Sequence, residues 1–319
     1  MNEGKIIYNK KLQEHNSFSN NKLYFFKIIL ALFFFYQAKF KNTILIELLS
    51  YNNLNINQYK EAINLTKGGL LEVYENKDKR NEIETKIGKI YKSEILFLII
   101  PGGAYKFVSN REGFPIAQKF FKLGYSSAIL FYSVYPHCYP SSYNQGLQAI
   151  QILSSRFKKI ILIGFSAGGH LAGLLGTTER KQLYNAIGMI LCYPVISFIK
   201  KVHVKSRSNF FGNKVSNNIK NRKYFSVENR VNSETLPTFI WTAKKDKVVP
   251  YQNSLYMIEQ LKKNNVLFEA KIYEKGSHAM ALADRTSIVN RNKKYYNKEV
   301  AKWPILASEF FEKIIKNNK

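Results

Sequence analysis

Five consecutive residues, Gly-Phe-Ser-Ala-Gly at 164–168, constrain the fold of this chain more than any other stretch. They fit the pattern G-x-S-x-G, in which a serine stands on a sharp turn between a strand and a helix. An apolar run at 160–163 precedes them, and small residues with helical character follow at 169–175. Only small neighbours tolerate the strained backbone and the close packing of such a turn. The pattern predicts a strand, a turn that presents Ser166 as a candidate nucleophile, and a helix. The alternative is an ordinary structural turn.

A serine hydroxyl needs a base to act as a nucleophile, and the base needs an acid that orients it. In sheet proteins with this turn, the chain order is serine, acid, histidine. The chain has five histidines and three aspartates, and Asp246 and His278 fall in this order after Ser166. Each follows a strand candidate, at 238–242 and 268–273 respectively. We therefore expect a triad of these three side chains. Taken singly, the aspartate is also compatible with a solvated turn and the histidine with a surface loop.

The third requirement is a set of backbone amides that hold the negative charge of a tetrahedral intermediate. The apolar run at 95–100 predicts a strand buried on both faces, and it ends in Pro-Gly-Gly-Ala-Tyr at 101–105. Glycines let the backbone turn its amides inward without a side chain in the way. We predict the amides of Gly103, Ala104 and Ala167 as the donors, against the alternative of an ordinary Pro-Gly turn.

Together these motifs resemble the α/β-hydrolase carboxylesterases, nearest to the small bacterial branch related to hormone-sensitive lipase. That branch includes acetyl esterases and acetyl xylan/feruloyl esterase-like proteins. The matching stretches are 101–105, 109–113, 132–134, 164–172, 236–241 and 246–250. The resemblance runs from about residue 70 to the C-terminus. It implies the same triad and short-chain acyl esters, often acetylated sugars, as substrates. Ala104 in place of a glycine and the loop at 135–138 depart from the commoner pattern, which affects the acyl pocket and not the chemistry.

The remaining pattern predicts alternating strands and helices, which is typical of a parallel sheet with helices on both faces. Further strands are expected at 126–131, 160–163 and 187–192, and helices at 114–123, 141–156, 252–263 and 300–316. We expect an α/β-hydrolase fold with a mostly parallel central sheet in residues 70–319. A small cap insertion is expected at about 197–235.

Residues 1–69 are expected to form an N-terminal extension, with an apolar helix at 23–36. A transmembrane helix needs about twenty apolar residues, and this run is shorter. A signal peptide would need a small residue where Tyr36 stands. We expect a cytoplasmic enzyme without a cleaved signal. Secretion or membrane association through 23–36 stays open as the alternative.

The formal net charge of +27 raises nucleic-acid binding as a hypothesis. The basic residues are spread along the chain, so no nucleic-acid partner is expected. One segment, 200–223, holds eight Lys or Arg and no acid. It is either a solvated loop or a rim that attracts an anionic polysaccharide. Cys138 and Cys192 make neither a disulfide framework nor a zinc site. No metal and no cofactor are expected.

The leading functional hypothesis is a serine carboxylesterase that hydrolyses short-chain, mainly acetyl, esters of small molecules or saccharides. Tyr105, Phe107 and Phe210 are candidate substrate contacts. Two other functions stay open: a peptidase or amidase on the same fold, and a non-catalytic binding protein that has kept the scaffold.

Overall fold

The structure is a computed structural model that describes residues 56–85, 88–212, 218–287 and 293–317. The chain divides into two units, residues 1–52 and 53–319. The first unit, with the helix expected at 23–36, lies outside the described residues. Among the helices that are described, none combines the length and apolar character needed to span a membrane.

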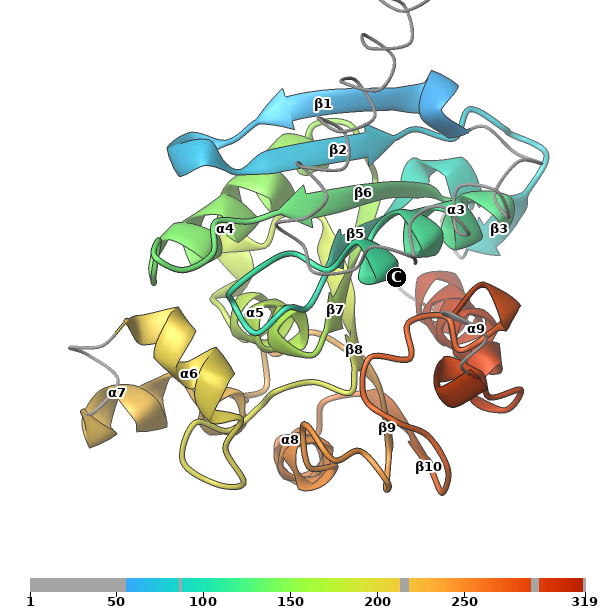
Figure 1. Cartoon of the computed structure of the whole chain (residues 1–319). Helices are drawn as coiled ribbons and strands as arrows, with labels where there is room; N and C mark the ends of the chain where they lie inside the picture. The colour runs from blue at the N-terminus through green and yellow to red at the C-terminus, as the bar shows by residue number, and fades with distance from the viewer. Residues whose placement is uncertain (1–55, 86–87, 213–217, 288–292, 318–319) are drawn as a thin grey trace, which may run out of the picture. The chain divides into compact units, whose positions relative to one another are not determined.

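An eight-stranded sheet forms the centre of the second unit (Figure 1). In spatial order its strands are β1 (Lys60–Asn64), β2 (Leu70–Tyr74), β6 (Ser126–Phe131), β5 (Ile95–Ile100), β7 (Lys159–Phe165), β8 (Ala186–Cys192), β9 (Thr238–Ala243) and β10 (Phe268–Tyr273). Neighbours from β6 to β10 pair in parallel, whereas β2 is antiparallel to both β1 and β6. The predicted mostly parallel sheet is confirmed.

The sheet begins earlier than expected, because β1 precedes the predicted start near residue 70 by ten positions. Its sequence, Lys-Glu-Ala-Ile-Asn, is mostly exposed and pairs only with β2 at the edge of the sheet. An edge strand of this kind needs no apolar face, so no hydrophobic pattern marks it. Another antiparallel pair, β3 (Glu82–Thr85) and β4 (Gly88–Tyr91), forms a separate small sheet.

Helices cover both faces of the central sheet (Figure 1). On one face lie α3 (Phe114–Lys122) and α9 (Trp303–Asn317), and on the other lie α4 (Ser141–Ser154), α5 (Ala167–Gly176) and α8 (Gln252–Lys263). The expected helix at 300–316 starts as a 3-10 turn, η9 (Val300–Lys302), and becomes α-helical at Trp303. Pro115 in the first turn of α3 and Gly124 (φ +95°) just past its end are the usual boundary residues of a helix.

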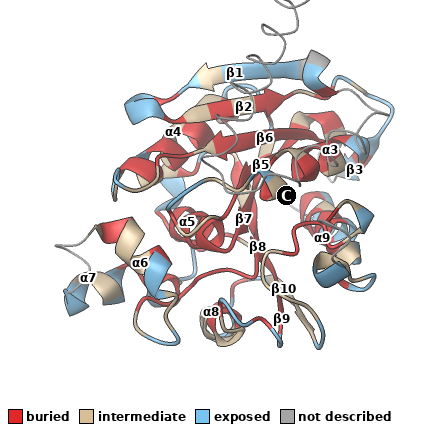
Figure 2. Cartoon of the chain, in the orientation of Figure 1, coloured by how far each residue is buried: buried red, intermediate tan, exposed pale blue. Residues whose placement is uncertain are grey.

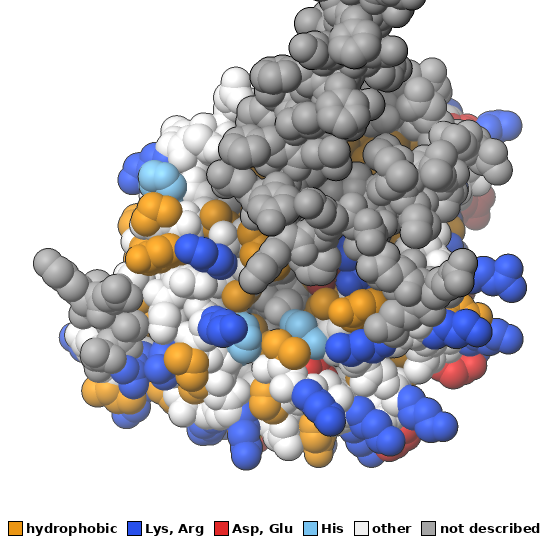
Figure 3. Space-filling view, viewed as in Figure 1, with side chains coloured by type: hydrophobic (Ala, Val, Ile, Leu, Met, Phe, Trp, Pro, Cys, Tyr) orange, Lys and Arg blue, Asp and Glu red, His pale blue; other side chains and the backbone are white. Residues whose placement is uncertain are grey.

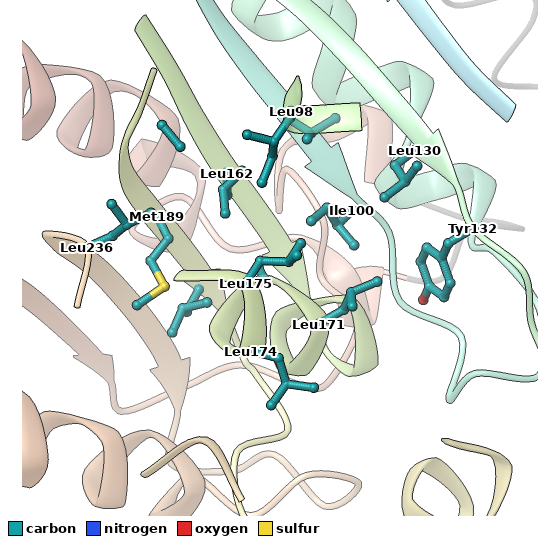
Figure 4. Packing of buried hydrophobic residues seen from close by; sticks show 14 of the residues in the cluster. Leu98, Ile100, Leu130, Tyr132, Leu162, Leu171, Leu174, Leu175, Met189 and Leu236 are labelled. Atoms are coloured by element: carbon teal, nitrogen blue, oxygen red, sulfur yellow. The ribbon is translucent and has the colours of Figure 1, made fainter. Parts of the chain in front are cut away.

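The core consists of two apolar layers that the sheet separates. Side chains of β5 alternate between them, with Leu96, Leu98 and Ile100 in one layer and Ile95, Phe97 and Ile99 in the other. Figure 4 shows the first layer, where leucines of α5 lie against side chains from β5, β6 and β7. Figure 2 shows which residues are buried: the central strands are buried, whereas exposed residues lie on β1 and α7. Burying each such side chain contributes roughly 1.5–3 kcal/mol, so the core holds the strand ends, and the loops that follow them, in fixed positions.

The segment between β8 and β9 forms a small insertion beside the sheet (Figure 1). It contains two short helices, α6 (Val204–Phe211) and α7 (Ile219–Tyr224), and a 3-10 turn, η6 (Val227–Asn229). Residues 213–217 lie outside the described part of the chain. The insertion thus falls within the range expected for a cap. Where Figure 3 shows described atoms, basic side chains are scattered over the surface and do not form one patch.

Candidate active site

Ser166 stands on the turn between β7 and α5, as the sequence pattern predicted. Its backbone is strained, with φ 51° and ψ −115°. The flanking glycines are required by close packing. A Cβ on Gly164 would lie 2.4 Å from the carbonyl oxygen of Gly168, and one on Gly168 would lie 2.0 Å from that of Ile100. The turn therefore fits only the small residues that the sequence supplies, and it presses the start of α5 against the end of β5.

The structure brings the three predicted triad residues together. Ser166 Oγ lies 2.8 Å from His278 Nε2, and His278 Nδ1 lies 2.7 Å from Asp246 Oδ2. The other carboxylate oxygen of Asp246 accepts the backbone amides of Val248 and Val249, at 2.8 and 3.0 Å. The serine, the aspartate and the histidine follow β7, β9 and β10. Because these strands are parallel, all three residues lie at the carboxyl-terminal ends of the strands, on the same side of the sheet.

Hydrogen-bond chemistry fixes which nitrogen of a neutral His278 carries the proton. An ionised carboxylate only accepts, so Nδ1–H donates to Asp246. Nε2 is then free to accept the Ser166 hydroxyl proton. The Asp246 side chain is fully buried and the His278 side chain is 12% exposed. The aspartate is therefore held away from water, while the base can still be reached from outside.

The loop after β5 supplies the amides that were predicted as an oxyanion hole. Gly103 has φ +125°, and Ala104 has φ +55°. No hydrogen bond within the described residues engages either of these two amides. Ala167 is the first residue of α5, where an amide has no acceptor within its own helix. Within the described residues, none of these three amides has a hydrogen-bond acceptor, and their role as an oxyanion hole stays a prediction.

The expected substrate contacts fall into two groups. Phe107 is 46% exposed, and its role stays a prediction. Tyr105 and Phe210 are 2% and 1% exposed, so both rings are packed inside the protein, and their role as substrate contacts also stays a prediction. The Tyr105 hydroxyl lies 2.9 Å from Nδ1 of the buried His170, and both rings pack on Phe210. These contacts join the loop after β5 and helix α5 to helix α6 of the insertion.

Three residues without a role in the sequence analysis lie against the site. Tyr193 packs its ring edge-on against His278, with centroids 5.0 Å apart. Its hydroxyl donates to the buried carboxylate of Glu112. His203 precedes α6, and its pKa is lowered by burial and, after that, by the charge of His278. Glu112 lies in the matched stretch 109–113, which is the one signal in the sequence that pointed to it.

The site offers no donor set for a metal. Across the described ranges, no group of three or more His, Cys, Asp or Glu side chains is placed to hold an ion. Cys192 is a packed core residue with no exposed surface, and this burial raises the pKa of its thiol well above the ordinary value. Serine, imidazole and carboxylate are arranged on the α/β sheet with the geometry that the triad of a serine hydrolase requires.

Comparison with known proteins gives the same class. Residues 148–303 match the prolyl oligopeptidase family. The chain is 30% identical over 208 residues to the endo-1,4-beta-xylanase B of Butyrivibrio fibrisolvens, covering 59% of this chain and 32% of that protein. It is 29% identical over 191 residues to an acetylxylan esterase of Xylanibacter ruminicola, covering 56% and 39%. The chain spans about a third of the length of these curated relatives.

The solved structure of a sugar hydrolase from Lactococcus lactis is 30% identical to this chain, with a TM-score of 0.65. The match covers 81% of this chain and 98% of that one. The chain therefore belongs to the α/β-hydrolase family, as its motifs indicated.

Proposed function

We propose that the protein is a serine carboxylesterase that hydrolyses short-chain acyl esters, mainly acetyl esters, by way of an acyl-enzyme. The observation that carries this proposal is the continuous relay from Ser166 Oγ through His278 to Asp246, at 2.8 and 2.7 Å. Free backbone amides lie on the loop packed against the serine turn. A nucleophile, its base and a site for the developing negative charge are the parts that acyl transfer needs.

In this reaction Ser166 Oγ attacks the ester carbonyl carbon while His278 Nε2 takes the hydroxyl proton. The amides of Gly103, Ala104 and Ala167 hold the oxyanion, and each such donor contributes about 3 kcal/mol. The imidazolium then gives its proton to the leaving alcohol, which leaves an acyl-serine. Water, deprotonated by the same nitrogen, attacks the acyl carbon; the bond to Ser166 Oγ then breaks, the acid is released, and the imidazolium returns its proton to Oγ. Asp246 keeps the imidazole in the required tautomer throughout.

The names of the relatives support an acetylated saccharide as the substrate class. One of them is an acetylxylan esterase, and two others are named a xylanase and a sugar hydrolase. The His278 side chain, which would protonate the leaving alcohol, is 12% exposed and can be reached from solvent. A panel of acyl chain lengths on an aryl alcohol and on xylose should show the highest kcat/KM for acetyl.

The decisive experiment is Ser166→Ala assayed with an aryl acetate. We expect turnover to fall by at least about 10³-fold, because removal of the nucleophile leaves only binding and the oxyanion hole. Ser254→Ala is the matched control. Its hydroxyl is buried on α8 and has no hydrogen-bond partner among the described residues. Wild-type turnover by Ser166→Ala would refute the assignment.

A peptidase on the same fold is the second candidate, favoured by the match of residues 148–303 to the prolyl oligopeptidase family. The triad does not choose between esters and amides, so substrates must decide. If aminoacyl anilides give a higher kcat/KM than acetylated sugars, the peptidase function replaces the esterase.

A further inference from the structure

A buried carboxylate lies between the two loops that build the site. Glu112 ends the 3-10 turn η4 (Asn110–Glu112) and is 3% exposed. No ion pair joins it to a cation in the described parts of the chain. A buried carboxylate is costly unless hydrogen bonds hold its charge. Its two oxygens have one donor each: Gly102 N at 2.8 Å and the Tyr193 hydroxyl at 2.7 Å.

The first donor belongs to the oxyanion loop. Gly102 directly precedes Gly103, the first predicted oxyanion donor. A Cβ on Gly102 would lie 3.0 Å from Ser166 Cβ and 2.7 Å from Glu112 Oε2. The bond from Gly102 N therefore ties down the loop at the point where it touches the nucleophile. It also engages this amide, so that the free amides begin at Gly103.

The second donor belongs to the other half of the site. The Tyr193 ring lies against the His278 ring, and its hydroxyl also accepts the amide of Ala281 at 3.0 Å. Ala281 lies three residues beyond His278 on the same loop. Burial, and after it the charge of Glu112, raises the pKa of Tyr193 well above its ordinary value. The hydroxyl therefore stays protonated and keeps donating.

We propose that Glu112 is a positioning residue, which fixes the oxyanion loop and the histidine loop relative to each other through Gly102 and Tyr193. It touches neither Ser166 nor His278 itself. The amides that bind the oxyanion and the imidazole that moves the proton must meet at the same substrate carbon, within a fraction of an ångström. One carboxylate that holds both loops provides this alignment. The inference rests on the proposed acyl-transfer function.

The test is Glu112→Gln, with Tyr193→Phe and the double variant. Glutamine keeps the shape, but its amide nitrogen donates, so it can no longer accept from both partners. We expect kcat for an aryl acetate to fall about 10- to 100-fold while KM changes less than about threefold. The two changes break the same chain of contacts, so the double variant should lose much less than the product of the single losses.

The matched control is Glu228→Gln, at a carboxyl that is 4% exposed in η6. No hydrogen bond links it to the triad within the described residues. This variant should keep the wild-type kcat. A trifluoromethyl ketone forms a tetrahedral adduct whose oxyanion uses the same amides, so its Ki should rise in parallel with the loss of kcat/KM.

A purely structural role predicts a lower melting temperature with unchanged kcat and Ki in the folded protein, and that result would overturn the proposal. If Glu112→Gln does not fold, Tyr193→Phe carries the test, because it removes one hydroxyl and leaves the charge and the ring in place. A wild type without esterase activity would refute the proposed function instead. The inference would then be decided by whether Glu112→Gln slows fluorophosphonate labelling of Ser166.

Discussion

Replacing His170 with glutamine should make the protein less sensitive to acid. This histidine is fully buried on α5. Its Nε2 lies 2.8 Å from the carbonyl oxygen of Phe225, which can only accept, so Nε2 carries the proton and Nδ1 accepts from the Tyr105 hydroxyl. Both nitrogens are thus satisfied in the neutral ring. Burial is the main cause that lowers the pKa of His170 from 6.5 to about 3.

The magnitude follows from linkage. Between pH 6.5 and pH 3 the unfolded chain binds a proton at His170 and the folded chain does not. Proton binding at His170 therefore stabilises only the unfolded state, and the free energy of unfolding falls as the pH falls through this window. Above pH 6.5 neither state is protonated and the effect vanishes. Each pH unit is worth about 1.36 kcal/mol, so the loss at pH 4.5 is about 2.7 kcal/mol.

The assay is urea unfolding at pH 7.5 and pH 4.5, followed by fluorescence of Trp241 and Trp303, which are 1% and 0% exposed. Other acid-sensitive groups act in both proteins and cancel in the comparison. Wild type should lose about 2.7 kcal/mol more than His170→Gln between the two pH values. His170→Asn, which can keep the acceptor toward Tyr105, should behave in the same way. Equal acid losses in wild type and variants would refute the reasoning.

Two further predictions concern the relay and the core. Asp246→Asn should lower kcat about 10⁴-fold with little change in folding, because the amide donates to Nδ1 of His278 and shifts the proton to Nε2, where it blocks the base. Unchanged kcat in the aryl acetate assay would contradict this. Gly188→Ala should destabilise the fold by about 1–3 kcal/mol, since the new Cβ would lie 1.9 Å from the buried Phe311 ring. A thermal melt measures the loss, and turnover per folded molecule should stay at the wild-type level.

Much of the sheet could be predicted because its strands are apolar or alternating runs of the right length. The expected strands at 95–100, 126–131 and 268–273 coincide with β5, β6 and β10. The polar edge strand β1 could not be found this way, because only its partner makes it a strand. The start of the sheet was therefore placed too late.

In the candidate site, too, residues marked by a local sequence pattern could be predicted, whereas contacts made only by the fold could not. Ser166, Asp246 and His278 were found because few residues of the right type follow the serine in the right order. Glu112 and Tyr193 were not, because their contact joins positions 81 residues apart and no local pattern records it. The burial of the Tyr105 and Phe210 rings is likewise a product of packing, which residue type alone does not reveal.

The distribution of the site along the chain has a consequence for synthesis. Its parts follow β5, β7, β9 and β10, and the serine and its base are 112 residues apart. A nascent chain therefore carries the nucleophile long before it carries the histidine. Until the last parallel strand adds to the sheet, Ser166 has no imidazole beside it, so under the proposed function no acyl transfer is expected before that point. Under the proposed function, the first hydrolytic activity of a growing wild-type chain would therefore report that the whole sheet has formed.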